Sequence, residues 1–139
     1  MKSSGKWIGA EAEQDGKPVL IRARSAAIVD FGKPHLLVVD LGYDCDDDSE
    51  LPTDDQYEAI GAFETSALDR LEEAGNLVLV FIETVGGRVR YLAYSRDVEE
   101  AVGFIDLHAD PALRLEFQST EDHEWREYRE RLGSLIRPS

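Results

Sequence analysis

The first pattern along the chain is a pair of short extended segments, residues 6–13 and 18–24, on either side of a tight turn. Asp15-Gly16 lies between them, and because both positions of a type I′ turn need positive φ, this dipeptide predicts a two-residue hairpin loop. In that register, the face that we expect to look at the core carries Ile8, Ala10, Ala12, Val19, Ile21 and Ala23. The opposite face carries Trp7, Glu11, Arg22 and Arg24.

Residues 36–41 form a β-branched apolar run without helical spacing, which predicts a central strand. An amphipathic helix is predicted to start after Pro52 and to end near Glu73, with Thr53 as its N-cap and Gln56 in the capping-box position. Its apolar stripe consists of Tyr57, Ile60, Phe63, Ala67, Leu68 and Leu71. Gly75 follows as the C-terminal stop.

The strongest β pattern is a second hairpin, with strands at residues 77–84 and 88–94. Asp97 then caps a predicted short helix, whose apolar stripe is Val98, Ala101, Val102 and Ile105. An edge-like strand is predicted around residues 113–117. Residues 122–132 predict a closing amphipathic helix that presents Trp125 and Tyr128 on one side.

The predicted elements between residues 36 and 118 follow the order β-α-β-β-α-β. We therefore expect an α+β fold, a ferredoxin-like antiparallel sheet with an N-terminal β-hairpin and a C-terminal amphipathic helix, as a single domain over residues 1–139. Residues 77–82 are apolar at six successive positions, so both faces of that strand need a cover. The sequence leaves two candidates for the second cover: the C-terminal helix, or a second copy of the chain in a homodimer.

Composition and charge narrow the expected partners. The 139 residues include 29 acidic and 15 basic side chains, for a formal net charge of −14. Because phosphate binding needs clustered Lys and Arg, we expect no nucleic-acid partner and no membrane partner, whereas a basic protein would be attracted. A single cysteine excludes an internal disulfide, and no signal-peptide or membrane-spanning run is present, so we expect a cytoplasmic location.

The segment between the predicted central strand and the first helix is strongly acidic. Asp44, Asp46 and Asp48 fit the opening of a calcium loop, and Asp55 falls at its twelfth position. The fit then fails, because Ser49 replaces the glycine of the sixth position, the twelfth residue is not Glu, and a strand precedes the loop. We therefore interpret the segment first as a solvated connector, next as a surface for a basic partner, and last as a calcium site.

We find no coherent set of catalytic residues. Cys45 lies among carboxylates, whose negative field disfavours the thiolate that a nucleophile or metal ligand needs. His123 begins a segment like the H-E-x-x-H zinc helix, but Glu127 stands where the second histidine belongs. We therefore expect no catalytic residues, no metal and no cofactor.

Arginines are the exception in this acidic chain, because they pair up on strand faces. The candidate ligand-binding or partner-binding residues are Arg22, Arg24, Arg88 and Arg90. If their two strands lie close together, the planar guanidinium groups are suited to hold a carboxylate or phosphate. The competing interpretation pairs Arg22 with Glu11 and places Arg24 on the Trp7 ring, which would satisfy both arginines within the hairpin.

A further set of spaced features spans nearly the whole chain: Trp7 with Asp15-Gly16-Lys17-Pro18, Leu51-Pro52, Phe63-Glu64, Thr84, Gly87, Arg90, Tyr94, Asp122, Trp125 and Tyr128. Together they resemble a bacterial family catalogued as domain of unknown function 695, often found near or fused to relatives of RraB-type ribonuclease E inhibitors. The resemblance implies an α+β domain without an established activity, and it supplies no catalytic residues. Ser49-Glu50 stand where the family usually has a glycine, which indicates that the acidic loop is particular to this chain.

From these features we expect a noncatalytic protein-interaction or regulatory module of a bacterial cytoplasm. An immunity or antitoxin-like role against a basic toxin or enzyme is one concrete form, because a negative field steers a cationic partner. The alternative is a small-ligand (anion) binding or enzymatic domain that uses the arginine-bearing strand faces. A deep polar pocket would favour the alternative, and a flat surface would favour the interaction module.

Overall fold

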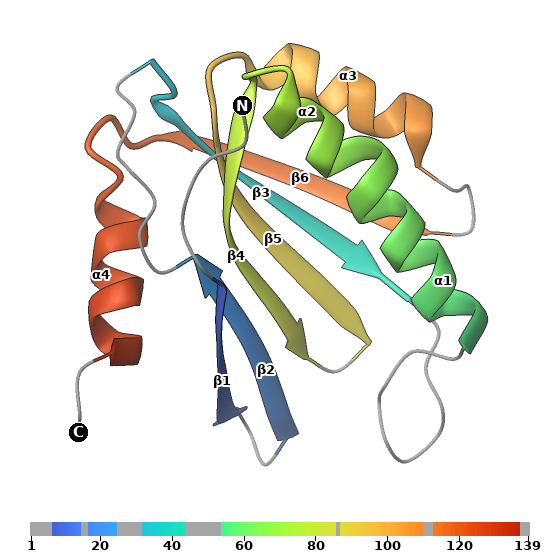
Figure 1. The fold of residues 1–139 in the computed structure, drawn as a ribbon, viewed down its shortest axis with the longest axis vertical. Coiled ribbons are helices and arrows are strands. Elements are labelled where there is room, and N and C mark those ends of the chain that lie inside the picture. Colours follow the sequence, from blue (N-terminus) through green and yellow to red (C-terminus); the bar gives the residue numbers. More distant parts are fainter. Residues whose placement is uncertain are drawn as a thin grey trace.

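The computed structural model describes residues 7–14, 17–24, 32–43, 54–85, 87–109 and 113–136. In this part of the chain, one antiparallel sheet of six strands carries helices on both faces (Figure 1). The α+β class predicted from the sequence is confirmed. The acidic segment, including Asp44, Asp46, Asp48 and Cys45, lies outside the described residues, as does the predicted N-cap Thr53.

The strand order in the sheet is β1-β2-β4-β5-β3-β6. The strands are β1 (Trp7–Gln14), β2 (Lys17–Arg24), β3 (His35–Gly42), β4 (Leu77–Val85), β5 (Arg88–Ser95) and β6 (Arg114–Glu121). The predicted hairpins are β1–β2 and β4–β5, and β6 forms an edge as predicted. The whole sheet differs in strand order from a four-stranded ferredoxin-like sheet, because β2 pairs with β4 and the N-terminal hairpin thereby extends the same sheet.

The N-terminal hairpin has the predicted register. Trp7 lies opposite Arg24 and Gln14 lies opposite Lys17, as predicted, while the predicted Asp15-Gly16 turn itself lies outside the described residues. The face predicted to look at the core does so: Ala23 is fully buried, and Ile8 packs against the same apolar cluster. Strand alternation therefore turns the other face, with Arg22 and Arg24, toward the first helix.

The first face of the sheet is covered by one layer of two helices (Figure 1). One is a continuous helix made of α1 (Asp54–Phe63), a π-helical turn η1 (Glu64–Leu68) and α2 (Asp69–Glu73). The other is α3 (Val98–His108), and the Asp97 side chain accepts a hydrogen bond from the Glu100 amide at 3.1 Å, as expected of its N-cap. The long helix ends as predicted before Gly75, whose φ of +81° suits glycine.

The buried core on this face consists of every second residue of the strands and of the helix residues predicted as the apolar stripe, apart from Tyr57. The central side chains are Leu37, Val39, Leu41, Phe63, Leu68, Leu71, Tyr91 and Ile105. Tyr57 departs from the prediction, because its side chain is 52% exposed. This first residue of the predicted stripe therefore lies at the rim of the core and faces solvent-accessible space.

The second face is covered by α4 (Arg126–Ile136), which was one of the two candidates for this role. Trp125, just before the helix, is completely buried and stacks on Tyr94 at 4.3 Å between ring centroids. Its indole N–H donates to the Lys33 carbonyl at 3.0 Å, and the Tyr128 hydroxyl donates to the Arg24 carbonyl at 2.5 Å. Within the described residues, no helix combines the length and the apolar character needed to span a membrane.

Candidate functional site

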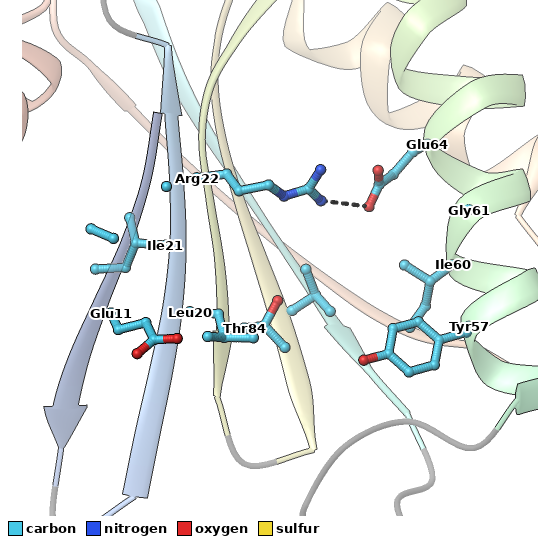
Figure 2. Close-up of a pocket in the computed structure, with 12 residues that line it drawn as sticks. Glu11, Leu20, Ile21, Arg22, Tyr57, Ile60, Gly61, Glu64 and Thr84 are labelled. Atoms are coloured by element: carbon cyan, nitrogen blue, oxygen red, sulfur yellow. Dashed lines mark ion pairs between the residues drawn. The ribbon is translucent and has the colours of Figure 1, made fainter. Parts of the chain in front are cut away.

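A hollow of about 780 Å³ opens between the N-terminal hairpin and the long helix. In Figure 1 the hairpin and α1 stand on either side of β4 and β5, and Figure 2 shows side chains from both sides pointing into this space. We call it the helix–hairpin groove. Its lining residues are Gly9, Ala10, Glu11, Leu20, Ile21, Arg22, Tyr57, Ile60, Gly61, Glu64, Thr84 and Val89.

The groove exists because the long helix covers only part of the first sheet face. The hairpin extends the sheet past β4, and the apolar side chains of its groove side find no helix above them. Leu20 is 41% exposed on the hairpin wall, and Tyr57 is 52% exposed on the helix wall. Large apolar side chains facing each other across an open hollow are typical of a binding surface.

Glu64 supplies the main polar group at one end of the groove. It is the first residue of the π-helical turn η1, and such turns are frequent at functional sites. Its Oε2 accepts a hydrogen bond from the Tyr91 hydroxyl at 2.8 Å and lies 3.5 Å from Arg22 Nη2 (Figure 2). Among the described residues, no side chain donates a hydrogen bond to Glu64 Oε1.

Tyr91, on β5 of the sheet, fixes the position of the Glu64 carboxylate through this hydrogen bond. Burial of the phenol, followed by the nearby Glu64 charge and the hydrogen bond to it, raises the pKa of Tyr91 far above its ordinary value. The hydroxyl is therefore protonated at physiological pH and always a donor. Its ring also packs on Phe63, with centroids 5.6 Å apart, so the donor itself is held in place.

The other charged groups in the groove are Glu11 on β1 and Arg22 on β2. Two carboxylates and one guanidinium group therefore line the groove. The Arg22 side chain is 55% exposed, and its contact with Glu64 at 3.5 Å is longer than a good hydrogen bond. An exposed ion pair of this kind contributes little free energy, so Arg22 is able to leave Glu64 at small cost.

Arg24 is engaged in a buried contact next to the groove. Its guanidinium nitrogens lie 2.9 and 3.2 Å from the two carboxylate oxygens of Glu72, and both side chains are almost completely buried. It also lies over the Trp7 ring at 4.9 Å, which confirms the predicted cation–π contact. The predicted partner of Arg22 was wrong: its ion pair is with Glu64 of the helix rather than with Glu11, because the helix approaches this face of the hairpin.

The structure does not bring the four predicted arginines together. Arg90 pairs with Asp40 at 2.9 Å. Their neighbours along each strand point into the core under the long helix, so Arg90 and Asp40 point to the opposite face, the one that α4 covers. Arg88 shares that side and is exposed. Arg22 and Arg24 face the long helix instead, so a single site formed by all four is not assembled. A ligand-binding role for either pair stays a prediction.

Glu64 and Tyr57 were not among the predicted site residues, although a signal for Glu64 was present. Glu64 lies four residues after Ile60 and four before Leu68, within the apolar stripe of the helix. A carboxylate at such a position needs a partner, which here is the hydroxyl of Tyr91. Sequence spacing alone does not reveal that partner, because the two residues are 27 positions apart.

The described residues contain no group of three or more His, Cys, Asp or Glu side chains arranged to hold a metal ion. His123 is exposed and contacts Glu121 at 3.4 Å. Asp55, the last residue of the calcium-loop pattern, is the exposed second residue of α1. The calcium hypothesis itself rests on residues outside the described part of the chain.

Comparison with known proteins places the chain in a sequence family. The model of a family of unknown function, DUF695, matches residues 5–132. No curated protein matches the chain, and no solved structure matches it. The match confirms the resemblance found in the sequence, whereas the bacterial setting and the link to RraB-type inhibitors remain expectations.

Proposed function

The chain belongs to the DUF695 family, and because that family has no assigned function, we propose one from the geometry: a noncatalytic binding module whose helix–hairpin groove holds part of a protein partner. We place the module in a bacterial cytoplasm, on the sequence grounds given above. An immunity or antitoxin-like role remains one concrete form of this proposal.

The observation that supports the proposal most is the pairing of exposed apolar walls with a fixed carboxylate. Leu20 and Tyr57 offer apolar contact area from two different elements, and Glu64 marks one end of the groove with an oriented charge. Apolar anchors surrounded by a few polar groups are the usual composition of a recognition site. The lining residues supply shape and charge, which supports binding rather than a chemical reaction.

Two glycines make this proposal directly testable. Gly61 lines the groove on α1, and a Cβ added there meets no atom within 4 Å, so a large side chain fits without a clash at its base and projects into the groove. Gly103 on α3 has the same freedom but lies outside the groove. Gly61→Phe and Gly103→Phe therefore add the same side chain to a helix, and only the first fills the groove.

The experiment is a parallel recovery of tagged wild-type protein and both variants from native lysate at low salt, with bound proteins quantified by mass spectrometry. We expect a partner recovered in stoichiometric amount by the wild type and by Gly103→Phe, and at least about tenfold less by Gly61→Phe, a difference of 1.4 kcal/mol or more in binding free energy. Equal recovery by the two variants, or a clean wild-type bait, would refute the proposal.

A further inference from the structure

We infer that the helix–hairpin groove recognises a basic segment of its partner, in which a lysine or arginine lies beside an apolar residue. This inference rests on the proposed function and adds the chemistry of the occupant. The apolar residue would lie between Leu20 and Tyr57, and the cation would bind at the Glu64 end. Three features support this inference: the open side of the Glu64 carboxylate, the weak ion pair of Arg22, and the negative net charge of the chain.

Glu64 is prepared to accept a hydrogen bond from a ligand. Its Oε2 accepts a hydrogen bond from the Tyr91 hydroxyl at 2.8 Å, while Oε1 accepts none from another described residue. Because the Tyr91 ring is fully buried and the Glu64 side chain is 24% exposed, the carboxylate is fixed on one side and open on the other. A charge-assisted bond from an ammonium or guanidinium group suits an acceptor that needs no reorganisation.

The rest of the lining favours a cation carried on an apolar stem. Glu11 adds a second carboxylate on the hairpin wall, and the exposed Tyr57 ring offers a π face. A lysine or arginine buries its methylene stem on apolar surface while its charged end reaches a polar group. The apolar lining of Leu20, Ile60 and Val89 provides that surface.

Arg22 is the one cation among the described lining residues, and it does not block this occupant. Its side chain is 55% exposed, and its closest approach to Glu64 is 3.5 Å. Since an exposed pair of this kind contributes little, an incoming cation with better geometry displaces Arg22 into solvent. The formal charge of −14 acts in the same direction, because it attracts a basic segment and repels an acidic one before contact.

The test uses three blocked dipeptides that differ in charge at one side chain. Phenylalanyl-lysine, phenylalanyl-norleucine and phenylalanyl-glutamate, each acetylated and amidated, are titrated into the 139-residue protein while amide chemical shifts are followed by NMR. We expect the lysine peptide to bind about tenfold more tightly than the norleucine peptide, with the largest shifts at groove residues. The glutamate peptide should bind most weakly.

Variants locate the charge preference. Glu64→Gln keeps an acceptor for Tyr91, and Glu11→Gln changes an exposed position of the edge strand, so at least one variant retains the fold. Each should lower affinity for the lysine peptide about three- to tenfold and leave the norleucine peptide unchanged. Glu99→Gln on α3, exposed and outside the groove, is the matched control and should change neither.

The remaining outcomes overturn the inference in distinguishable ways. Equal binding of the three peptides would leave an apolar groove without charge preference, and tightest binding of the glutamate peptide would assign the site to Arg22 and an anionic partner. No binding by any peptide would refute the inference as well. In each case, loss of partner recovery by Gly61→Phe but not by Gly103→Phe would still support the proposed function, so the two can fail separately.

Discussion

Replacing Trp125 by Ala is the sharpest test of how the second sheet face is covered. Trp125 is completely buried, its ring stacks on Tyr94 at 4.3 Å with an interplanar angle of 9°, and its indole N–H donates to the Lys33 carbonyl. The side chain thus joins the start of α4 to the sheet and to the segment before β3. If this contact is removed, α4 loses its main anchor.

The magnitude follows from these contacts. Deleting a buried Trp side chain costs roughly 3–5 kcal/mol. The lost hydrogen bond accounts for about 1 kcal/mol and the aromatic stacking for about another 1 kcal/mol, which argues for a total near 4 kcal/mol. The positive φ of 55° at this position adds no difference, because Ala is strained there as Trp is. A loss of this size is a large part of the stability of an ordinary domain, about 5–15 kcal/mol.

The assay is urea unfolding followed by far-ultraviolet circular dichroism. With a slope of about 2 kcal/mol per molar urea, a loss of 4 kcal/mol lowers the unfolding midpoint by about 2 M. Trp7→Ala is the matched control, because Trp7 is 40% exposed and contacts Arg24 through its ring, so we expect a loss of about 1 kcal/mol or less. Trp125→Phe keeps an aromatic ring and should retain part of the stability if the Ala variant unfolds.

A loss below about 1 kcal/mol for Trp125→Ala, or losses of equal size for the two tryptophans, would contradict this expectation. Either result would mean that α4 does not depend on the packing of Trp125. The second cover suggested by the sequence, another copy of the chain, would then have to be reconsidered.

Two further predictions concern charged groups with buried contacts. Arg24→Met should lower the free energy of unfolding by about 3 kcal/mol, because it removes the cationic partner of the buried Glu72. Adding Glu72→Gln should recover at least half of that loss. Purely additive losses in a double-mutant cycle would contradict the pairing. Burial alone would raise the pKa of Asp122, but hydrogen bonds from two backbone amides of α4 and from a tyrosine hydroxyl outweigh it and lower the pKa below its ordinary value of 3.8. Since the folded state holds the depressed pKa, this stabilisation is present above pH 3.8 and is lost as the pH falls through the folded-state pKa. Asp122→Asn should therefore be less stable than the wild type at about pH 6, and the difference should shrink as the pH falls below 3.8. A pH-independent difference would contradict the assignment.

Much of the fold could be predicted because its signals are local. The Asp-Gly dipeptide predicted the register of the first hairpin, and in that register Trp7 lies opposite Arg24, where the predicted ring contact is found. Capping by Asp97 and the stop before Gly75 also depend on residues within a few positions of each other. Such signals act through backbone geometry, so a single sequence carries them.

The candidate site was largely hidden, because it depends on how distant segments meet. The groove forms because the N-terminal hairpin extends the sheet beyond the part that the long helix covers. The residues next to Leu20 or Tyr57 in the sequence carry no signal for this arrangement. Arg22 was assigned to the wrong carboxylate for the same reason: Glu64 is brought to it by tertiary packing. The π-helical turn that begins at Glu64 and the positive φ of Trp125 were not predicted either.

Site-specific photo-crosslinking shows whether a protein partner occupies the helix–hairpin groove. A photoreactive phenylalanine derivative would replace Gly61 in one variant and Gly103 in another, since both positions accept a large side chain without a clash at Cβ. We expect irradiation in native lysate at low salt to yield a discrete crosslinked product from position 61 and none from position 103. Crosslinks from position 103 alone, or from neither position, would contradict binding in the groove.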